Sequence, residues 1–309
     1  MPGRIVVRIA LLAAMTALGP TACELSDITL AEPADLLVVE VVLKAGDTIQ
    51  TAFLHRTVSA AGGARIFDAT VTVREDGGGP PMSFEADADS LCLFPAPPTP
   101  PFPAGTCYVA RGRTALVRPG IRYTLEVALP DGRRLTGSTQ VPGEFALVRP
   151  AAPCRLPAGT GMDLAWTRAA GASVYIGETR MDHLVAALRA AGVEIERADT
   201  PVDLLGLAIG SADTTMAFPG EFGLFDRADP ELHAILLAIR PGLPPGVRAD
   251  IAIAAADRNY VNWVRGGAFN PSGTVRVPSL HGDGTGVIGS LVIRRTAIDT
   301  GDADLPSCP

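Results

Sequence analysis

The stretch RPGIRYTLEVALPDGRRLTGSTQVP, residues 118–142, carries the clearest structural signal in the chain. Large apolar residues occupy every second position from Tyr123 to Leu129, with polar or small residues between them. This period of two predicts a strand with one buried face. Pro130-Asp131-Gly132 then predicts a tight turn into a second strand, RRLTGSTQV (133–141). The stretch therefore predicts a β-hairpin.

The residues before this hairpin extend the same pattern. Runs rich in β-branched residues, separated by turn residues, occur in LLVVEVVLKAG (36–46), DTIQTAFLHRTV (47–58) and ATVTVRED (69–76). Roughly seven strands in about 110 residues are typical of an immunoglobulin-like sandwich. The fold class predicted from the sequence is therefore mainly β, and residues 35–145 are predicted to form an Ig-like β-sandwich.

A second β-rich domain is predicted for residues 146–309, after a proline-rich linker from Pro142 to Pro157. MDLAWTRAAGASVYIGETRM (162–181) predicts two strands and is similar to the opening hairpin of fibronectin-type sandwiches, and VRADIAIAAA (247–256) and GVIGSLVIRRTAI (286–298) predict two more. Two short helices are also expected, one capped by Asp182 and ending at Gly192, the other capped by Asp257.

The first 22 residues predict export. Arg4 and Arg8 form a positive start, and the apolar run from Ile9 to Leu18 is too short to cross roughly 30 Å of hydrocarbon. Residues 1–22 are therefore predicted to be a signal peptide, and residues 23–34 a polar tether to the membrane.

Cys23 follows small residues at the end of that apolar run, in an arrangement that resembles a bacterial lipobox. Pro20 stands where a leucine or a similar residue is usual. The five cysteines leave one thiol unpaired in an exported protein, and lipidation of Cys23 accounts for it. Ordinary cleavage nearby, which leaves Cys23 free, is the alternative. Acylation would anchor the chain stably in a membrane.

The other four cysteines predict disulfides, for which three pairings exist. Cys92 and Cys107 flank a proline-rich loop, and Cys154 and Cys308 bracket the second half of the chain. These two pairings are the favoured ones. No CxxC motif occurs, so the cysteine spacing does not indicate a zinc site.

Charge and motifs argue against several function classes. The net charge is −7, without the basic stripe that a nucleic-acid partner requires. Gly284, Gly286 and Gly289 have GxGxxG order, but a strand-like segment follows them, so no dinucleotide cofactor is expected. The histidines are scattered, and the acidic clusters 85–89 and 299–304 are expected to be solvated loops and not a metal site.

Five segments follow the anchoring cysteine in a fixed order: LLVVEVVL, DATVTVREDGG, RPGIRYTLEVALPDGRRLTGSTQVP, DLAWTRAAGASVY and GDGTGVIGS. This order resembles the envelope lipoproteins grouped as domain of unknown function 4249. The resemblance covers most of residues 35–295. It implies an N-terminal sandwich on a lipid tether, in some cases encoded beside outer-membrane receptors, and supplies no catalytic residues.

The sequence thus leads to three functional hypotheses. The first is a non-enzymatic outer-membrane lipoprotein, facing the periplasm or the cell surface, that binds or assists an outer-membrane receptor or transporter. The second is a carbohydrate-binding or adhesive surface module that uses the loops at one end of the sandwich. Tyr260 and Trp263 could form a sugar-stacking platform, but three residues apart on a helix they are expected to face the core. The third is a hydrolase whose site no motif reveals.

Overall fold

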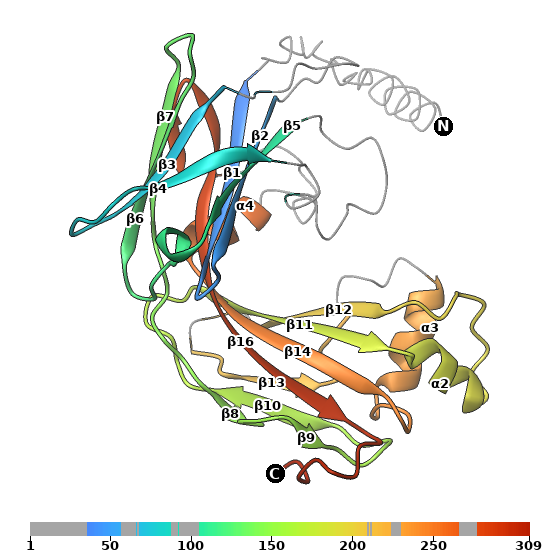
Figure 1. Ribbon diagram of the computed structural model, residues 1–309. Coiled ribbons are helices and arrows are strands. Elements are labelled where there is room, and N and C mark those ends of the chain that lie inside the picture. Colours follow the sequence, from blue (N-terminus) through green and yellow to red (C-terminus); the bar gives the residue numbers. More distant parts are fainter. Residues whose placement is uncertain are drawn as a thin grey trace, which may run out of the picture. The chain divides into compact units, whose positions relative to one another are not determined.

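Figure 1 shows the computed structural model, which describes residues 36–56, 66, 68–87, 92, 105–208, 210, 212–223, 230–265 and 277–309. Most elements of these residues are strands, as predicted, and residues 35–309 form a single structural unit. Among the helices described, none has both the length and the apolar character needed to cross a bilayer.

The first half of the chain forms a sandwich of two sheets. One sheet has the order β1 (Leu37–Ala45), β2 (Ile49–Arg56), β5 (Gly105–Arg111) and β4 (Met82–Asp87), and the other has β3 (Thr70–Glu75), β6 (Arg122–Ala128) and β7 (Arg134–Gln140). Strand β4 pairs with β5 through one end and with β3 through the other. This order matches strands A-B-E-D against C-F-G of a constant-type immunoglobulin domain, which confirms the predicted sandwich.

The hairpin of β6 and β7 follows its sequence pattern. Tyr123, Leu125 and Val127 are buried, and their neighbours point to the outer face. Gly132 closes the turn at a positive φ of 93°, a conformation that glycine adopts at little cost. The Tyr123 hydroxyl accepts a hydrogen bond from the backbone N–H of Arg118, five residues upstream, as in the tyrosine corner of immunoglobulin folds.

The second half forms another sandwich. A sheet of β8 (Leu147–Arg149), β10 (Met162–Trp166) and β13 (Thr215–Phe218) faces a sheet of β12 (Val202–Ala208), β11 (Val174–Asp182), β14 (Arg248–Ala256) and β16 (Gly284–Asp299). The rings of Trp166 and Tyr175 meet between the sheets, with centroids 5.3 Å apart. The face-to-face packing of two sheets is the architecture of fibronectin-type sandwiches.

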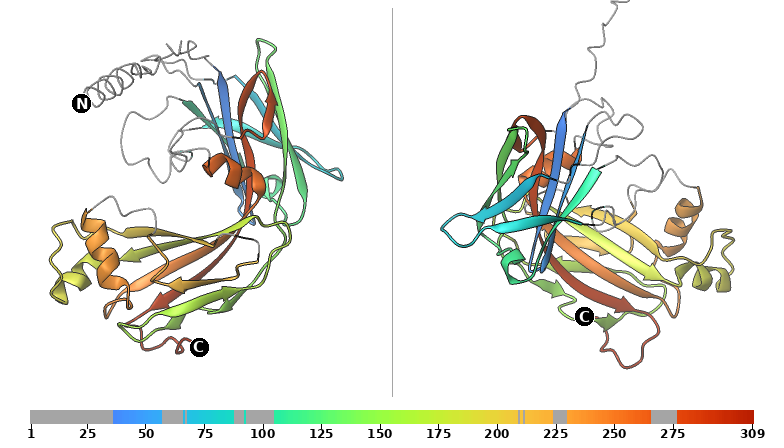
Figure 2. Two further views of the ribbon diagram at one scale, coloured as in Figure 1. Left: turned by 180° about the vertical axis from the view of Figure 1, so that it is seen from behind. Right: turned by 45° about the horizontal axis from the view of Figure 1, so that its top comes forward.

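Strand β16 belongs to both sandwiches (Figures 1 and 2). Its first part runs parallel to β1, from Gly284 beside Leu37 to Val292 beside Ala45. Its second part runs antiparallel to β14, ending with Asp299 beside Arg248. The short β15 (Leu280–Gly282) also pairs with β7 of the first sandwich.

The division predicted at residues 145 and 146 therefore differs from the structure. Residues 280–292 follow the predicted boundary in sequence, yet they form edges of the first sandwich. Parallel pairing between segments so far apart leaves no local pattern in the sequence, because each segment alone has the pattern of an ordinary strand.

The predicted linker Pro142–Pro157 also differs, because it contains two short strands. Strand β8 is an edge strand of the second sandwich, and β9 (Cys154–Arg155) pairs with the end of β16. Both strands are too short to produce a periodic signal.

The described residues contain three α-helices, whereas two were predicted. These are α2 (Leu184–Ala190), α3 (Pro230–Ile239) and α4 (Arg258–Arg265), with a 3₁₀ turn at Arg113–Ala115. The unexpected helix is α3, which begins with proline and glutamate, a usual start for a helix.

The caps of two helices can be compared with the predictions. The cap predicted at Asp182 is wrong, because this residue ends β11 and α2 has His183 at its N-cap without a side-chain hydrogen bond. Asp199 instead accepts the N–H of Ala186 in the first turn of α2. The predicted cap at Asp257 is confirmed, because its Oδ1 accepts the N–H of Tyr260.

Both favoured disulfides are present. Cys92 is bonded to Cys107 in β5, with Cα atoms 5.6 Å apart. Cys154 in β9 is bonded to Cys308, with Cα atoms 5.0 Å apart, and the Cys308 N–H donates to the carbonyl of Arg155. The second bridge therefore fastens the chain end to the beginning of the second sandwich.

The two bridges should contribute unequally to stability, because the loops that they close span 15 and 154 residues. In the chain-entropy model, replacing Cys154 and Cys308 together by alanine should lower the unfolding free energy by about 5 kcal/mol, against about 3 kcal/mol for Cys92 and Cys107. Chemical denaturation of the two double variants tests this order. A larger loss for the Cys92–Cys107 pair would contradict it.

Candidate functional site

A hollow with a volume of about 920 Å³ lies on the outer face of the sheet β12-β11-β14-β16. We call it the sheet groove. Its walls combine side chains from all four strands with one aromatic side chain of α4. The residues on which its chemistry depends are Glu178, Arg180, Asp203, Arg248, Asp250, Ala252, Tyr260 and Arg295.

The strand register arranges these side chains in rows. One row across the sheet contains Asp203, Arg180 and Asp250. The next row contains Leu205, Glu178, Ala252 and Arg295. Side chains of one row on the same sheet face are neighbours, about 5 Å apart from strand to strand. The rows therefore place carboxylates and guanidinium groups side by side on the groove floor.

Most of these charges are already paired. Arg180 lies 3.6 Å from Asp203 and 3.7 Å from Asp182, and Arg248 lies 3.0 Å from Asp250. Glu178 and Arg295 differ, because the side chain of neither makes an ion pair or a hydrogen bond with another residue of the described ranges. Ala252 stands between them in the row. The pair of opposite charges thus flanks a small, open position.

Helix α4 covers the apolar end of the same sheet face (Figure 2). Tyr260 and Val261 pack on a small hydrophobic cluster that includes Ala254, Ala256 and Leu291. Burial raises the pKa of the Tyr260 hydroxyl, and the nearby carboxylate of Glu178 raises it further. The hydroxyl is therefore neutral at pH 7.

Asp257 holds α4 in this position. Only 4% of its surface is exposed. Its Oδ1 accepts the backbone N–H of Tyr260 at 2.9 Å and that of Ser290 at 3.1 Å, and its Oδ2 accepts the Thr139 hydroxyl at 2.6 Å. One carboxylate therefore joins β7 of the first sandwich, the shared strand β16 and the start of α4.

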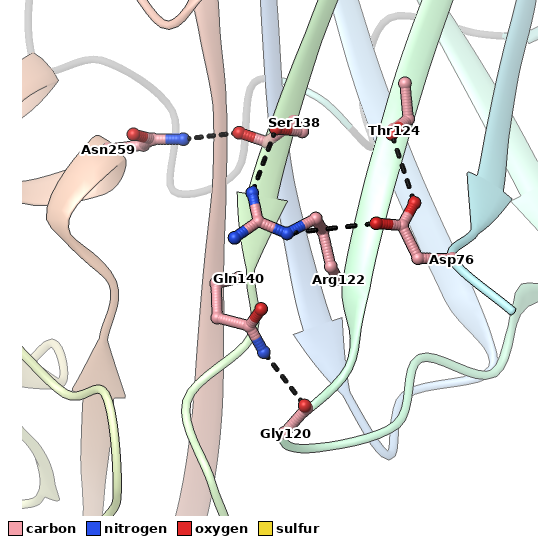
Figure 3. Close-up of polar contacts among 7 residues, drawn as sticks. All are labelled: Asp76, Gly120, Arg122, Thr124, Ser138, Gln140 and Asn259. Carbon is pink, nitrogen blue, oxygen red and sulfur yellow. Dashed lines mark hydrogen bonds and ion pairs between the residues drawn. The ribbon is translucent and has the colours of Figure 1, made fainter.

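Asn259 adds a second link at the same place (Figure 3). Its amide donates to the carbonyl of Ser138 at 2.8 Å and to that of Ile288 at 2.9 Å. Gly289 lies against α4, where a Cβ atom would come 2.9 Å from the Tyr260 Cβ. Helix α4 consequently lies close against β16, and Tyr260 has a defined place at the groove.

Figure 3 also shows a network on the outer face of β6 and β7. Arg122 lies 3.8 Å from Asp76 and donates weakly to the Ser138 hydroxyl at 3.4 Å, and Gln140 donates to the carbonyl of Gly120. These groups are exposed, and such pairs contribute little to stability. We regard this face as a solvated surface.

The residues singled out in the sequence have clear positions, except Cys23 and Asp89, which lie outside the described residues. Asp299 and Asp302 accept backbone N–H groups in the final loop. Asp87 pairs with Arg111. In the described ranges, no three His, Cys, Asp or Glu residues gather where they could hold a metal ion.

The groove itself was not predicted. The alternation in VYIGETRMD (174–182) and RADIAIAAA (248–256) marks which residues lie on the outer face, including Glu178 and Asp250. It does not reveal which residues of different strands share a row, because the register depends on pairing across the sheet.

No known protein family model and no curated protein matches this chain. Solved structures similar to it include the FN1–FN3 domains of chicken CNTN1, at 13% identity and a TM-score of 0.24, covering 87% of this chain and 68% of that one. Fibronectin(III)-like modules of Clostridium thermocellum CbhA match at 10% identity and a TM-score of 0.21, covering 86% and 95%. A complex of Dpr11 IG1 with DIP-gamma IG+IG2 matches at 8% identity and a TM-score of 0.19, covering 87% and 100%. These scores are too low to support any argument about function.

Loss of the Asp257 carboxylate should release α4. In Asp257→Ala, two backbone N–H groups and the Thr139 hydroxyl lose their acceptor in a buried place, so the unfolding free energy should fall by about 2–4 kcal/mol. Denaturant titration measures this change. Thr124→Ala, which removes an exposed hydroxyl from β6, is the control and should change stability by less than about 0.5 kcal/mol.

The stability should also depend on pH through Asp257. Burial raises its pKa above the ordinary value, although the hydrogen bonds from Thr139, Tyr260 and Ser290 lower it in part. The folded state therefore favours the protonated carboxyl. This preference stabilises the folded protein fully at acidic pH, and the stabilisation is lost as the pH rises through the pKa of Asp257 in the folded state. The unfolding free energies of wild type and Asp257→Asn are measured from pH 3 to pH 8. As the pH rises, the unfolding free energy of the wild type should fall relative to that of Asp257→Asn. A difference that stays constant would contradict the raised pKa.

Proposed function

We propose that this chain is a non-enzymatic binding module of the bacterial envelope, exported and anchored through a lipidated Cys23, that uses the sheet groove to hold its ligand. In this role it assists an outer-membrane receptor or transporter. The observation that carries the proposal is the open groove, whose floor contains two opposite charges, Glu178 and Arg295, without partners among the described residues.

Charged groups left without partners at the floor of a hollow support a binding role. Concave surfaces with a few well-placed polar groups are the usual form of ligand sites. In the sheet groove these groups stand on paired strands, and Asp257 fixes the adjoining helix, so the site keeps its shape before a ligand arrives. A site formed in advance loses less entropy on binding.

Two features support export and anchoring. The disulfides Cys92–Cys107 and Cys154–Cys308 suit an oxidising compartment such as the periplasm or the cell surface. The leader and the lipobox-like segment before Cys23 supply the means of export and attachment. A lipid-anchored module with a ligand site suits a role beside a membrane receptor or transporter.

A carbohydrate-binding or adhesive surface module is the second candidate function. The aromatic ring of Tyr260 beside the unpaired charges of the groove is the observation that favours it.

Filling the groove should abolish ligand retention. Ala252→Trp places a large ring between Glu178 and Arg295, and Ala128→Trp places the same ring on the outer face of the first sandwich as a matched control. The full chain, produced in a host with an outer membrane and examined by native mass spectrometry after incubation with envelope extract, should retain a ligand. Ala252→Trp should lose this ligand, and Ala128→Trp should keep it. Equal retention by both variants would contradict the groove as the binding site.

Removing the anchoring thiol should release the protein from the membrane. Cys23→Ser should move the chain from the membrane fraction to the soluble periplasmic fraction, because the acyl chains supply the membrane affinity. Fractionation followed by mass spectrometry of the N-terminus measures this shift. A wild-type chain that carries no acyl group would contradict the anchor.

A further inference from the structure

The row that contains Glu178, Ala252 and Arg295 determines which chemical groups a ligand of the groove needs. A carboxylate stands at one side of the small Ala252 and a guanidinium group at the other, about 10 Å apart from strand to strand. The carboxylate accepts hydrogen bonds only, and the guanidinium donates them only. A ligand seated over Ala252 must therefore donate toward Glu178 and accept from Arg295.

The charges of the groove sum to zero. Its three acidic residues are Glu178, Asp203 and Asp250, and its three basic residues are Arg180, Arg248 and Arg295. The basic side chains of Arg180 and Arg248 are already neutralised by neighbouring aspartates. The groove thus offers no surplus charge for a phosphate, an acidic polymer or a polycation, and a ligand without net charge fits it best.

Tyr260 adds an apolar surface next to this row. Tyr260 is half-buried and lines the groove. An aromatic ring in this place can pack against an apolar ring face, and its neutral hydroxyl can join the hydrogen bonds at the rim. The groove therefore combines one apolar contact with one acceptor and one donor.

We propose that the Glu178–Ala252–Arg295 row, with Tyr260 beside it, is a subsite for an uncharged sugar ring. A sugar ring has apolar C–H groups on its faces and hydroxyl groups around its edge, and each hydroxyl can donate to a carboxylate or accept from a guanidinium group. This inference rests on the proposed function, because it names the ligand of the groove. It also sets a specificity: the net charge of a uronate or of an amino sugar is not offset in the neutral groove, because Glu178 and Arg295 act on it with opposite signs.

Binding to defined saccharides tests the subsite. The full chain is titrated calorimetrically with neutral oligosaccharides of glucose, galactose and mannose, and with oligosaccharides of uronic acids and of glucosamine. At least one neutral series should bind, and the matching uronate and glucosamine series should bind more weakly. Glu178→Gln and Arg295→Met should each weaken neutral binding at least about tenfold, because each removes a charge-assisted hydrogen bond.

Glu126→Gln and Arg74→Met on the outer face of the first sandwich are matched controls and should leave binding unchanged. Equal binding by the groove variants and the wild type, or tighter binding of charged saccharides, would overturn the inference. The inference would also be overturned if no saccharide binds, or if the ligand that Ala252→Trp loses proves to be a peptide. Ala252→Trp would in either case still test whether the groove is the binding site. If Ala252→Trp retains every ligand of the wild type, both the inference and the proposed function fail.

Discussion

The pairing of β16 with both β1 and β14 is the interaction on which the rest of the structure depends. The strand continues through Leu291 and Val292, which pair with β1 on one side and with β14 on the other. The two sandwiches therefore share backbone hydrogen bonds along one strand and are not joined by a flexible linker alone. Glycine at 284 and 286 permits the close approach to β1, because a Cβ atom at either position would collide with a carbonyl of that strand.

The groove follows from this arrangement. The second part of β16 supplies Arg295 to the groove floor, and the first part supplies Ser290 to the hydrogen bonds around Asp257. Asp257 in turn fixes α4 and hence Tyr260. Residues that define the candidate ligand site thus depend on the same strand that joins the sandwiches. A change in the pairing of β16 would therefore alter the groove through a short series of direct contacts.

The sequence predicts much of this fold and little of the site. Alternating apolar residues predicted the hairpin of residues 118–142, and helix-capping chemistry predicted Asp257 at the start of α4. The two disulfide pairings followed from the positions of the cysteines. The parallel pairing of β1 with β16 was not predictable in this way, because it joins segments far apart in the chain and neither alone differs from an ordinary strand. The meeting of Glu178, Ala252 and Arg295 was missed for the same reason, since their row depends on the register of three strands.

Hydrogen exchange of the full chain with Gly286→Val tests most directly that β16 unites the two sandwiches. The substitution places a side chain against the backbone of Val39 at a positive φ of 141°. If β16 unites the sandwiches, amide exchange should be faster than in the wild type along β1, along β16 and along β14, because both pairings share one strand. Faster exchange confined to residues 284–290, with β1 and β14 protected as before, would contradict it.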